Sequence, residues 1–446
     1  MQIALSTHHV LVILAGTGLL ALPYALRQGG LVVFILGMFL ISSWNIYCMK
    51  LLCECLEYLI RLADFHDELV RSPVVNQKRS SGVLPWNGCD RFSIRLRDPP
   101  PPGTSTFAKL GWYALGDFGL WSIDCMMLIL LLFINIAFEV AILTFLRDTP
   151  FTTGAKLIDG AVLAFILVPF CIVDDLSGLS KLSRFGLIVL GVTMAVVACY
   201  GIMGQDDIQL MNETVKEGQS GKSSSPFTLL PRNGLQGVSK WFGCVVFSFG
   251  VVPLTFNFRQ SMTEPEKLPN AAAISMSIVG MVYAMIGVYF LYLFPNINND
   301  LLAELPSTGF VATTTRLAMV VVVMASTPLL IVPCAEIIEG KVMKSGNASG
   351  SRKWMIIIRT LLLLSTVGVA AELPNFVAVL AFVGCFAVSM VSFVLPPGLH
   401  WLLLGQGFDK SQGGMDYPLW SRIGDISMLF VGFTTTIITT WFAWSS

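Results

Sequence analysis

The stretch from Gly16 to Tyr24 reads Gly-Thr-Gly-Leu-Leu-Ala-Leu-Pro-Tyr and lies inside an apolar run long enough to cross a bilayer. Two glycines and a proline are poor helix formers, and proline also removes a backbone N–H donor. Because an unpaired peptide group in hydrocarbon costs several kcal/mol, a broken helix persists only where protein buries it or where it lines a wet cavity. The stretch therefore indicates a binding site or, alternatively, a kink that lets two helices pack closely.

A second interruption, Phe247 to Pro253, reads Phe-Ser-Phe-Gly-Val-Val-Pro and falls within the sixth apolar span. It begins what can be a second set of five spans. Paired interrupted segments at corresponding places in two halves of a chain are typical of transporters built from inverted repeats. The second interruption therefore favours a binding site over a kink for both segments.

Broken helices offer a specific chemistry. The amino end of a half-helix leaves free N–H groups and a partial positive charge, which suit a carboxylate, and a carboxyl end offers carbonyls, which suit an ammonium. Two broken helices that cross at the midplane predict a cradle for a zwitterion, and glycines let the ligand approach the backbone. We predict that the carboxylate end is formed by Gly16, Thr17 and Gly18, and that the amino group and side chain meet Ser248, Phe249 and Gly250. Phe249 is the predicted lid, and the alternative is an ordinary lipid-facing or core aromatic.

Composition identifies a polytopic membrane protein. Of the 446 residues, 54% are hydrophobic and 13% charged, and a soluble domain usually has about twice that charged share. Lys and Arg (28) balance Asp and Glu (28), so the net charge indicates no nucleic-acid partner. About eleven apolar stretches reach spanning length, and we expect the first to serve as an uncleaved anchor. They lie at 6–26, 31–60, 117–146, 157–173, 185–204, 240–258, 272–294, 313–335, 354–371, 375–395 and 424–445.

The polar segments predict the domain organisation. We expect helices one and two within 1–62, a disordered cytosolic loop at 63–110, helices three to five at 111–205, an extracytosolic loop at 206–239, and helices six to eleven at 240–446. The cytosolic assignment rests on the basic excess of 63–110 and of a second basic segment, 341–353, and it places the amino terminus in the cytosol. Asn212, in an Asn-Glu-Thr pattern, then falls outside as a predicted glycosylation acceptor.

Several motifs occur together in a fixed order along the chain, namely Gly16–Ala25, Gln28–Gly30, Met262–Pro265, Ala335–Ile338 and Leu373–Asn375. With these motifs the chain resembles the amino acid/auxin permease family over nearly its whole length, and the proton-assisted amino acid transporters are its nearest match there. The resemblance implies an all-α integral membrane protein of about eleven transmembrane helices. It also implies the five-plus-five inverted-repeat fold of the bacterial leucine transporter, with helices one and six broken, carrying amino acids with protons or sodium.

Two ionisable residues are candidates for proton coupling. His9 lies seven residues before Gly16, about two helical turns away on the same face. The resemblance implies a coupling histidine at this spacing, and an imidazole titrates near neutral pH. The alternative is a polar residue at the membrane entrance. Glu139, late in the third span, is the second candidate, and its alternative is solvation near the outer surface. Gly250 stands where the proton-assisted group has an acidic residue, which leaves the coupling route and the substrate preference open.

Other chemistries have weaker signals. Ser326 and Thr327 are the alternative coupling residues, as hydroxyl ligands for a sodium ion, although such hydroxyls commonly bond to their own helix. No Gly-x-Ser-x-Gly motif, phosphate loop or metal-spaced cluster of histidines and cysteines occurs, so we predict neither an enzyme nor a cofactor.

The sequence therefore predicts a secondary active transporter of small neutral amino acids, working as a proton-coupled symporter by alternating access. The alternatives are a sodium-coupled or vacuolar exchanger of the same fold, or an amino acid receptor that does not transport. The predicted partners are the amino acid and the lipid bilayer, in the plasma membrane or in an acidic organelle such as the vacuole or lysosome.

Overall fold

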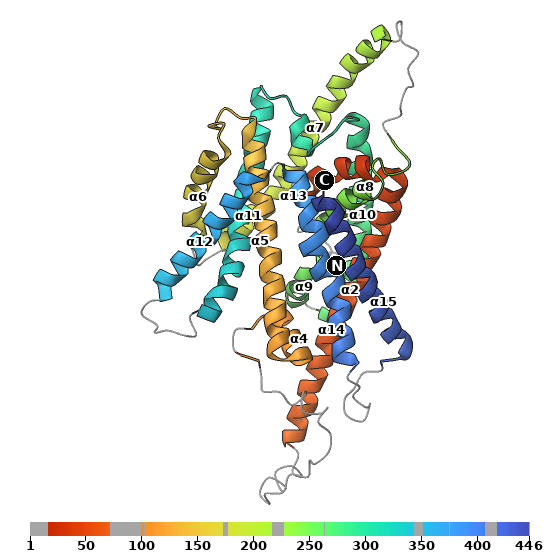
Figure 1. The fold of residues 1–446 in the computed structure, drawn as a ribbon, viewed down its shortest axis with the longest axis vertical. Helices are drawn as coiled ribbons and strands as arrows, with labels where there is room; N and C mark the ends of the chain where they lie inside the picture. Colours follow the sequence, from red (N-terminus) through yellow and green to blue (C-terminus); the bar gives the residue numbers. More distant parts are fainter. Residues whose placement is uncertain are drawn as a thin grey trace, which may run out of the picture.

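A computed structural model describes residues 17–71, 100–101, 104–172, 177–215, 227–262, 264–342, 351–373, 375–405 and 417–445. Within these residues the regular structure is entirely helical (Figure 1). Nine helices in the described part are long and apolar enough to cross a membrane, as predicted for an integral membrane protein. The predictions for His9 and Gly16 lie outside the described residues.

The chain begins with the 3-10 helix η1, Thr17–Ala21, which leads directly into α2, Leu22–Arg71. The helices of the first half that follow are α4, Thr106–Leu115, α5, Asp117–Arg147, α6, Lys156–Ile172, and α7, Ser177–Val215. The second half contains α8, Leu235–Ser248, η2, Val252–Leu254, α9, Thr255–Ser261, η3, Pro265–Lys267, α10, Leu268–Leu293, η4, Leu301–Glu304, α11, Phe310–Val342, α12, Ser351–Glu372, α13, Phe376–Val383, the π-helical turns η7, Gly384–Val388, and η8, Met390–Val394, then α14, Leu395–Leu404, and α15, Leu419–Trp444.

The described residues contain nine spans rather than about eleven, and at two places the structure explains the difference. The predicted spans 6–26 and 31–60 are joined, because η1 and α2 form one helical path that bends at Gly30. The predicted span 157–173 corresponds to α6, which has 17 residues with Pro169 inside it and is therefore short for a bilayer. Hydropathy alone shows neither the bend nor the shortness.

The bend at Gly30 is a corner that requires glycine. Its φ of 73° and ψ of 161° lie in a region that side chains with a Cβ rarely adopt. The N–H of the next residue, Leu31, donates to the carbonyl of Thr228 at 2.9 Å, so the donor that the helix loses finds another partner. A Cβ on Gly30 would lie 2.6 Å from the carbonyl carbon of Leu230.

Both long polar segments are shorter than predicted. Helix α2 continues to Arg71 and α4 begins at Thr106, so helix enters the predicted loop 63–110 from both sides. Helix α7 continues to Val215 and α8 begins at Leu235, so the predicted loop 206–239 shortens in the same way. Hydropathy marks where a helix leaves the membrane, whereas propensity and capping decide where it ends. Asn212 lies on the helical backbone of α7, and its side chain is outside the described part.

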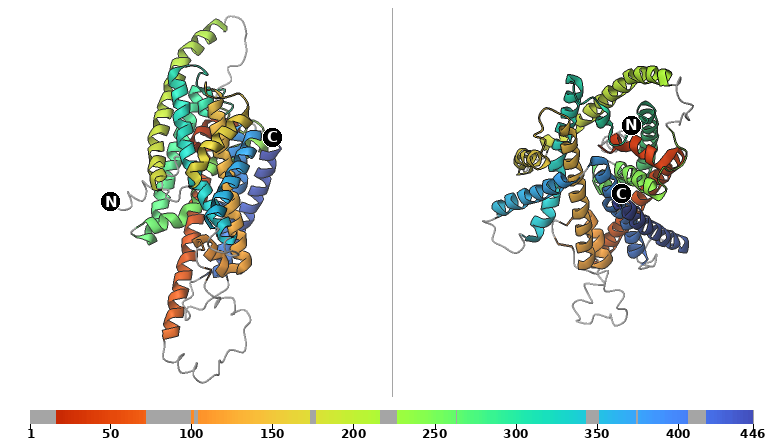
Figure 2. Two further views of the ribbon diagram at one scale, coloured as in Figure 1. Left: turned by 90° about the vertical axis from the view of Figure 1, so that its left-hand side faces the viewer. Right: turned by 45° about the horizontal axis from the view of Figure 1, so that its top comes forward.

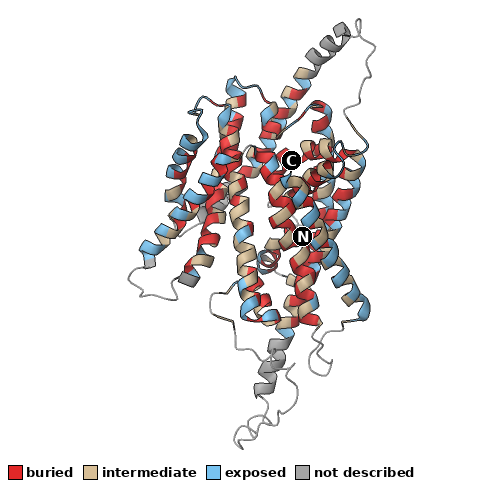
Figure 3. Ribbon diagram, viewed as in Figure 1, coloured by how far each residue is buried: buried red, intermediate tan, exposed pale blue. Residues whose placement is uncertain are grey.

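The helices pack in two groups. In one group α10 and α8 pack along α2, and α13 with η7 packs on α8. In the other group α11 packs along α5, and α12 packs along α6. The spans Leu235–Gln260 and Phe376–Leu404 are the most buried, and α15 is the most peripheral (Figure 3). The interrupted sixth span therefore lies at the centre of the molecule.

The two basic segments are flanked by helix ends at one end of the bundle. The end of α2, the start of α4, and the junction of α11 with α12 all lie at the lower end in Figure 1. The end of α7 lies at the opposite end, and Figure 2 shows α2 and α7 projecting in opposite directions. The helix ends that flank 72–99 and 343–350 therefore lie at the same end of the bundle, whereas the cytosolic assignment of these segments stays a prediction.

Candidate functional site

The structure interrupts the sixth span where the sequence predicted. Helix α8 ends at Ser248, and regular α-helix resumes at Thr255 after the single turn η2. At the interruption the N–H of Gly250 donates to the carbonyl of Phe247 at 3.1 Å, a tightened turn, and Pro253 has no N–H to donate. The local sequence thus ends α8 in the middle of the molecule.

The two predicted halves of the cradle meet in the structure. The 3-10 helix η1 packs on α8. A Cβ on Gly18 would lie 2.5 Å from the Oγ of Ser248 and 3.1 Å from its Cα. A Cβ at this position would require the Ser248 hydroxyl to rotate away and its backbone to shift slightly, so glycine fits this contact best. Gly18 and Ser248, more than two hundred positions apart in the chain, are thus brought together.

The polar groups at this contact differ in whether they have partners. The Ser248 hydroxyl donates to the carbonyl of Cys244 at 2.8 Å, within its own helix. The Tyr283 hydroxyl of α10 donates to the carbonyl of Ser248 at 3.4 Å. The Thr17 Oγ1 is buried and has no hydrogen-bond partner among the described residues. A buried hydroxyl without a partner is an available donor for a ligand oxygen.

Phe249 is fully buried, which excludes a lipid-facing position. Its ring centroid lies 5.3 Å from that of Tyr283, and its Cζ would lie 3.6 Å from a Cβ on Gly280 of α10. This is the packing of a core aromatic, and a lid in its closed position is buried in the same way. The predicted role of Phe249 as a lid therefore stays a prediction.

The tenth span contributes a feature that the sequence did not reveal. The two π-helical turns η7 and η8 follow α13 beside the interruption. A Cβ on Gly250 would lie 3.3 Å from Cγ1 of Val388, and the backbones of Gly243 and Gly384 touch. Extra residues in a helical turn are frequent at functional sites, because they re-aim backbone and side chains. The hydroxyl of Ser392 in η8 is buried without a partner in the described part of the chain.

Glu139 is fully buried, so its predicted alternative, solvation near the outer surface, is wrong. Its Oε1 accepts hydrogen bonds from Nδ2 of Asn135 at 2.8 Å and from Oγ1 of Thr366 at 2.9 Å. Its Oε2 is buried, and no described group bonds to it. The free oxygen can accept a proton, and the bonded one joins α5 to α12.

The two hydroxyls considered for sodium bond to their own helix. Oγ of Ser326 donates to the carbonyl of Val322 at 3.1 Å, and Oγ1 of Thr327 donates to that of Val323 at 3.3 Å. This is the arrangement that the alternative interpretation expected for serine and threonine in a membrane helix. It gives the sodium hypothesis no support in this conformation.

A capping segment, residues 294–309, joins α10 to α11 at the upper end in Figure 1 and packs on η1 through η4. Arg27 of α2 donates to the carbonyl of Asn296 at 2.9 Å and to Oδ1 of Asn298 at 2.5 Å. Arg316 of α11 is almost completely buried, and it donates to three carbonyls of the segment. These are the carbonyls of Leu302, Leu305 and Pro306, at 3.2, 2.8 and 2.9 Å.

Asp300 organises the single turn inside the capping segment. Its Oδ1 accepts from the N–H groups of Leu302 and Ala303, at 2.9 and 3.2 Å, as the N-cap of η4. Its Oδ2 is buried and no described group bonds to it. Burial raises the pKa of the Asp300 carboxyl from 3.8 to about 6, against the opposing effects of these backbone bonds and of Arg316.

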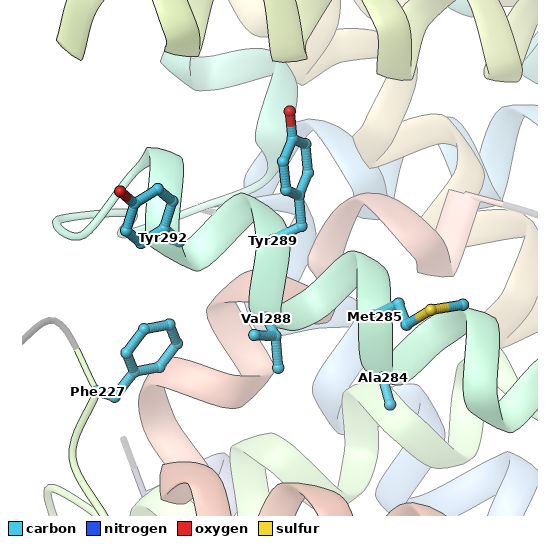
Figure 4. Close-up of a pocket in the computed structure, with 6 residues that line it drawn as sticks. All are labelled: Phe227, Ala284, Met285, Val288, Tyr289 and Tyr292. Atoms are coloured by element: carbon cyan, nitrogen blue, oxygen red, sulfur yellow. The ribbon is translucent and has the colours of Figure 1, made fainter.

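A surface hollow lies beside α10 (Figure 4). It has a volume of about 530 Å³ and is lined by Phe227 and by five residues of α10, namely Ala284, Met285, Val288, Tyr289 and Tyr292. The lining is apolar, several of its side chains are exposed, and none of the predicted binding residues belongs to it. It is the kind of surface that acyl chains cover in a membrane protein.

Sequence reasoning missed a buried ionic cluster as well. His400 of α14, Asp425 of α15 and Glu54 of α2 meet there from three different spans. Asn135 and Thr366 beside Glu139 were also missed. The available signal was the same in each case, because polar and ionisable residues inside spans are uncommon and often functional.

An interrupted span in the core of a polytopic helical protein is typical of membrane transporters. The chain matches the family described as "Transmembrane amino acid transporter protein" over residues 4–84 and 91–445, and it belongs to that family. The predicted family is thereby confirmed, and its members are transporters rather than enzymes.

Individual relatives agree with this assignment. "Amino acid transporter ANT1" of Arabidopsis thaliana is 23% identical over 95% of this chain and 88% of its own length. "Amino acid transporter AVT3A" of the same plant is 22% identical over 98% of this chain and 87% of its own length. "Vacuolar amino acid transporter 4" of Saccharomyces cerevisiae is 22% identical over 45% of this chain and 31% of its own length.

Proposed function

We propose that this protein is a secondary active transporter of small neutral amino acids, driven by protons through alternating access. The observation that carries the proposal is the contact between Gly18 of η1 and Ser248, where α8 ends at the interruption of the sixth span in the core. Backbone groups freed at such interruptions bind the charged ends of a zwitterion without charged side chains.

The packing supports a five-plus-five inverted repeat of about eleven spans. The count reaches eleven when α6 is included and when the helical path that bends at Gly30 is counted as two spans, one on each side of the bend. In this numbering α2 is span two and α10 is span seven. Helices α5 and α11 become three and eight, and α6 and α12 become four and nine. The members of each pair pack on one another, and η1 of the first span packs on α8 of the sixth. Partners five spans apart are expected to meet near a two-fold axis in the membrane plane.

In this proposal the substrate carboxylate binds at Thr17 and Gly18, where Thr17 offers its unpaired hydroxyl. The ammonium group and side chain face Ser248, Phe249 and Gly250. The close approach of Gly18 to Ser248, and the burial of Phe249 against Tyr283, favour a small side chain. The interruption from Phe247 to Pro253 has no charged residue, which favours a neutral one.

Glu139 is the described group best suited to carry the coupling proton. One of its carboxylate oxygens is held by Asn135 and Thr366, and the other is free. These two partners belong to different helices, so gain or loss of the proton changes the attachment of α5 to α12. His9 remains the other predicted coupling residue, outside the described part of the chain.

A panel of labelled amino acids tested on the full chain in proteoliposomes, with and without an imposed pH gradient, tests the proposal. We expect saturable accumulation of small neutral amino acids that follows the pH gradient and is unchanged when choline replaces sodium. Glu139→Gln should still bind and exchange substrate but lose accumulation, whereas Asp117→Asn, at the exposed start of the same helix, should not. Saturable binding with no accumulation would instead establish a receptor, and dependence on sodium would refute proton coupling.

A vacuolar exchanger is the second candidate, because relatives such as "Vacuolar amino acid transporter 4" carry that location in their names. Such a protein would move amino acids across an acidic organelle membrane in exchange for protons, rather than with them. The same proteoliposomes separate the two, because a symporter accumulates substrate on the alkaline side and an exchanger on the acidic side.

A further inference from the structure

A second cluster of ionisable side chains joins α2 to the end of α14 and the start of α15, and these two helix ends lie at the lower end in Figure 1. The His400 side chain of α14 is almost completely buried. Its Nδ1 lies 2.6 Å from Oδ2 of Asp425 in α15, and its Nε2 lies 3.1 Å from Oε2 of Glu54 in α2. The Tyr417 hydroxyl donates to the same Oδ2 of Asp425 at 2.6 Å. The proposed transport site contains none of these residues.

The contacts of His400 require one more proton than a neutral imidazole between two ionised carboxylates would have. A neutral imidazole has one N–H and one lone pair, whereas both ring nitrogens of His400 face a carboxylate oxygen. One of these contacts would set a lone pair against an anionic oxygen unless the imidazole is doubly protonated or a carboxyl carries the proton. The observed distances therefore describe the proton-loaded form of the cluster.

The charges of the four groups in direct contact balance in that form. Lys50 of α2 lies 3.6 Å from Glu54, so Lys50, protonated His400, Glu54 and Asp425 sum to zero. Without the proton these four groups have a net charge of −1. Oδ1 of Asp425 is buried with no bonding group in the described residues, so the negative charge there is already poorly compensated.

Further titratable groups lie around the cluster. The guanidinium of Arg422 lies 5.1 Å from the centre of the Tyr417 ring, and the Tyr47 hydroxyl lies near Gly424 of α15. Burial and Asp425 raise the pKa of the Tyr417 hydroxyl, which therefore stays a hydrogen-bond donor. The elements packed against α14 also carry Cys48, Cys55, Lys109 and Tyr113, of which Lys109 is exposed and the two cysteines are buried.

We propose that Glu54, His400 and Asp425 form a proton-binding site that fastens the lower ends of α14 and α15 to α2. Loss of the proton sets a carboxylate against the imidazole lone pair, and the three helix ends separate. Helix α2 leads through the bend at Gly30 to η1, and α14 follows the π-helical turns η7 and η8. The site therefore acts on η1, which forms the Gly18–Ser248 contact, and on η7, which lies beside Gly250 at the interruption, and only this consequence for transport rests on the proposed function.

Distance measurements on the full chain in lipid nanodiscs test the site without any transport. Spin labels on exposed Arg61 of α2 and exposed Trp420 of α15 report the separation, with Cys199→Ser as background because Cys199 is exposed. We expect one short distance at pH 5 and a longer one as the pH rises. The thermal unfolding temperature should fall over the same range, because the cluster stabilises the protein only when it holds the proton.

His400→Gln should remove both pH responses, whereas His66→Gln, another histidine of α2, should leave them intact. Glu54→Gln, at a half-exposed carboxylate, removes one negative neighbour and should move the transition to lower pH. It also provides a test should His400→Gln fail to fold. A separation in the unsubstituted protein that is independent of pH, or a pH response that survives in His400→Gln, would overturn the proposal. Failure of proton-driven uptake alone would refute only the proposed function.

Discussion

Adding one methyl group at Gly18 is the sharpest perturbation of the proposed site. The new Cβ would lie 2.5 Å from Oγ of Ser248, 3.1 Å from its Cα and 3.2 Å from its Cβ. The Ser248 hydroxyl can rotate away only by giving up its bond to Cys244, which is worth about 0.5–1.5 kcal/mol. The backbone of Ser248 must still shift. Overpacking of this kind costs about 1–3 kcal/mol.

That energy corresponds to a loss of roughly 5- to 150-fold in a rate or affinity that requires this conformation, at about 1.36 kcal/mol for each factor of ten. Ser248→Ala removes the closest atom, so the double variant Gly18→Ala/Ser248→Ala should recover part of the loss. Neighbouring residues coupled in this way show interaction energies of about 0.5–3 kcal/mol in a double-mutant cycle.

Initial rates of uptake in proteoliposomes, together with substrate affinity, provide the assay. Gly191→Ala in α7 is the matched control, because a Cβ at that helical glycine meets nothing within 4 Å. Thermal unfolding of each variant separates local crowding from loss of the fold. The reasoning is refuted if Gly18→Ala transports as well as Gly191→Ala, or if Ser248→Ala restores none of the lost activity.

Two further predictions concern the bend and the capping segment. Gly30→Ala should lower the free energy of unfolding by about 1–3 kcal/mol through backbone strain, and by more through its clash with Leu230. Gly154→Ala, at φ 82° with nothing within 4 Å, should show the cost of a positive φ without a clash. If both variants lose the same stability in thermal unfolding, the clash at Gly30 contributes nothing. The Asp300 carboxyl has its pKa raised to about 6 from 3.8, so the folded state binds more protons than the unfolded state between these values. The stability of the capping segment should therefore fall as pH rises from about 4 to about 6. Hydrogen-exchange protection of the segment, corrected for intrinsic exchange, measures this slope, and Asp300→Asn should flatten it. An unchanged slope in that variant would exclude Asp300 as its cause.

Local composition was enough to locate the membrane spans and the interruption of the sixth. Gly250 and Pro253 act within their own turn, so their effect on α8 can be read without the fold. The bend at Gly30 could not be read in this way, because it depends on Leu31 finding a partner in Thr228, far along the chain. The ends of α2 and α7 were also out of reach, since a polar helix can continue beyond the membrane.

The candidate site likewise contains residues that the local sequence predicts and residues that only the fold reveals. Thr17, Gly18 and Ser248 were predicted because the two interruptions repeat one chemistry in two halves. The partner of Glu139 in its own helix, Asn135, stands at the readable i−4 spacing. Thr366 and the His400 cluster depend on which spans become neighbours, and single-residue reasoning cannot supply that information.

The capping segment is attached more firmly to α11 than to α2, and this difference decides from which helix it detaches first. Arg316 holds it from within the protein through three carbonyl bonds, whereas Arg27, which bonds to Asn296, Ile297 and Asn298, is only partly buried, so water can replace its contacts more easily. Because α2 and α11 belong to different packing groups, any widening between the groups must detach the segment from one of them. We therefore expect it to detach from α2 first and to stay with α11, so that the Gly18–Ser248 contact is first exposed on the Arg27 side of this end of the molecule.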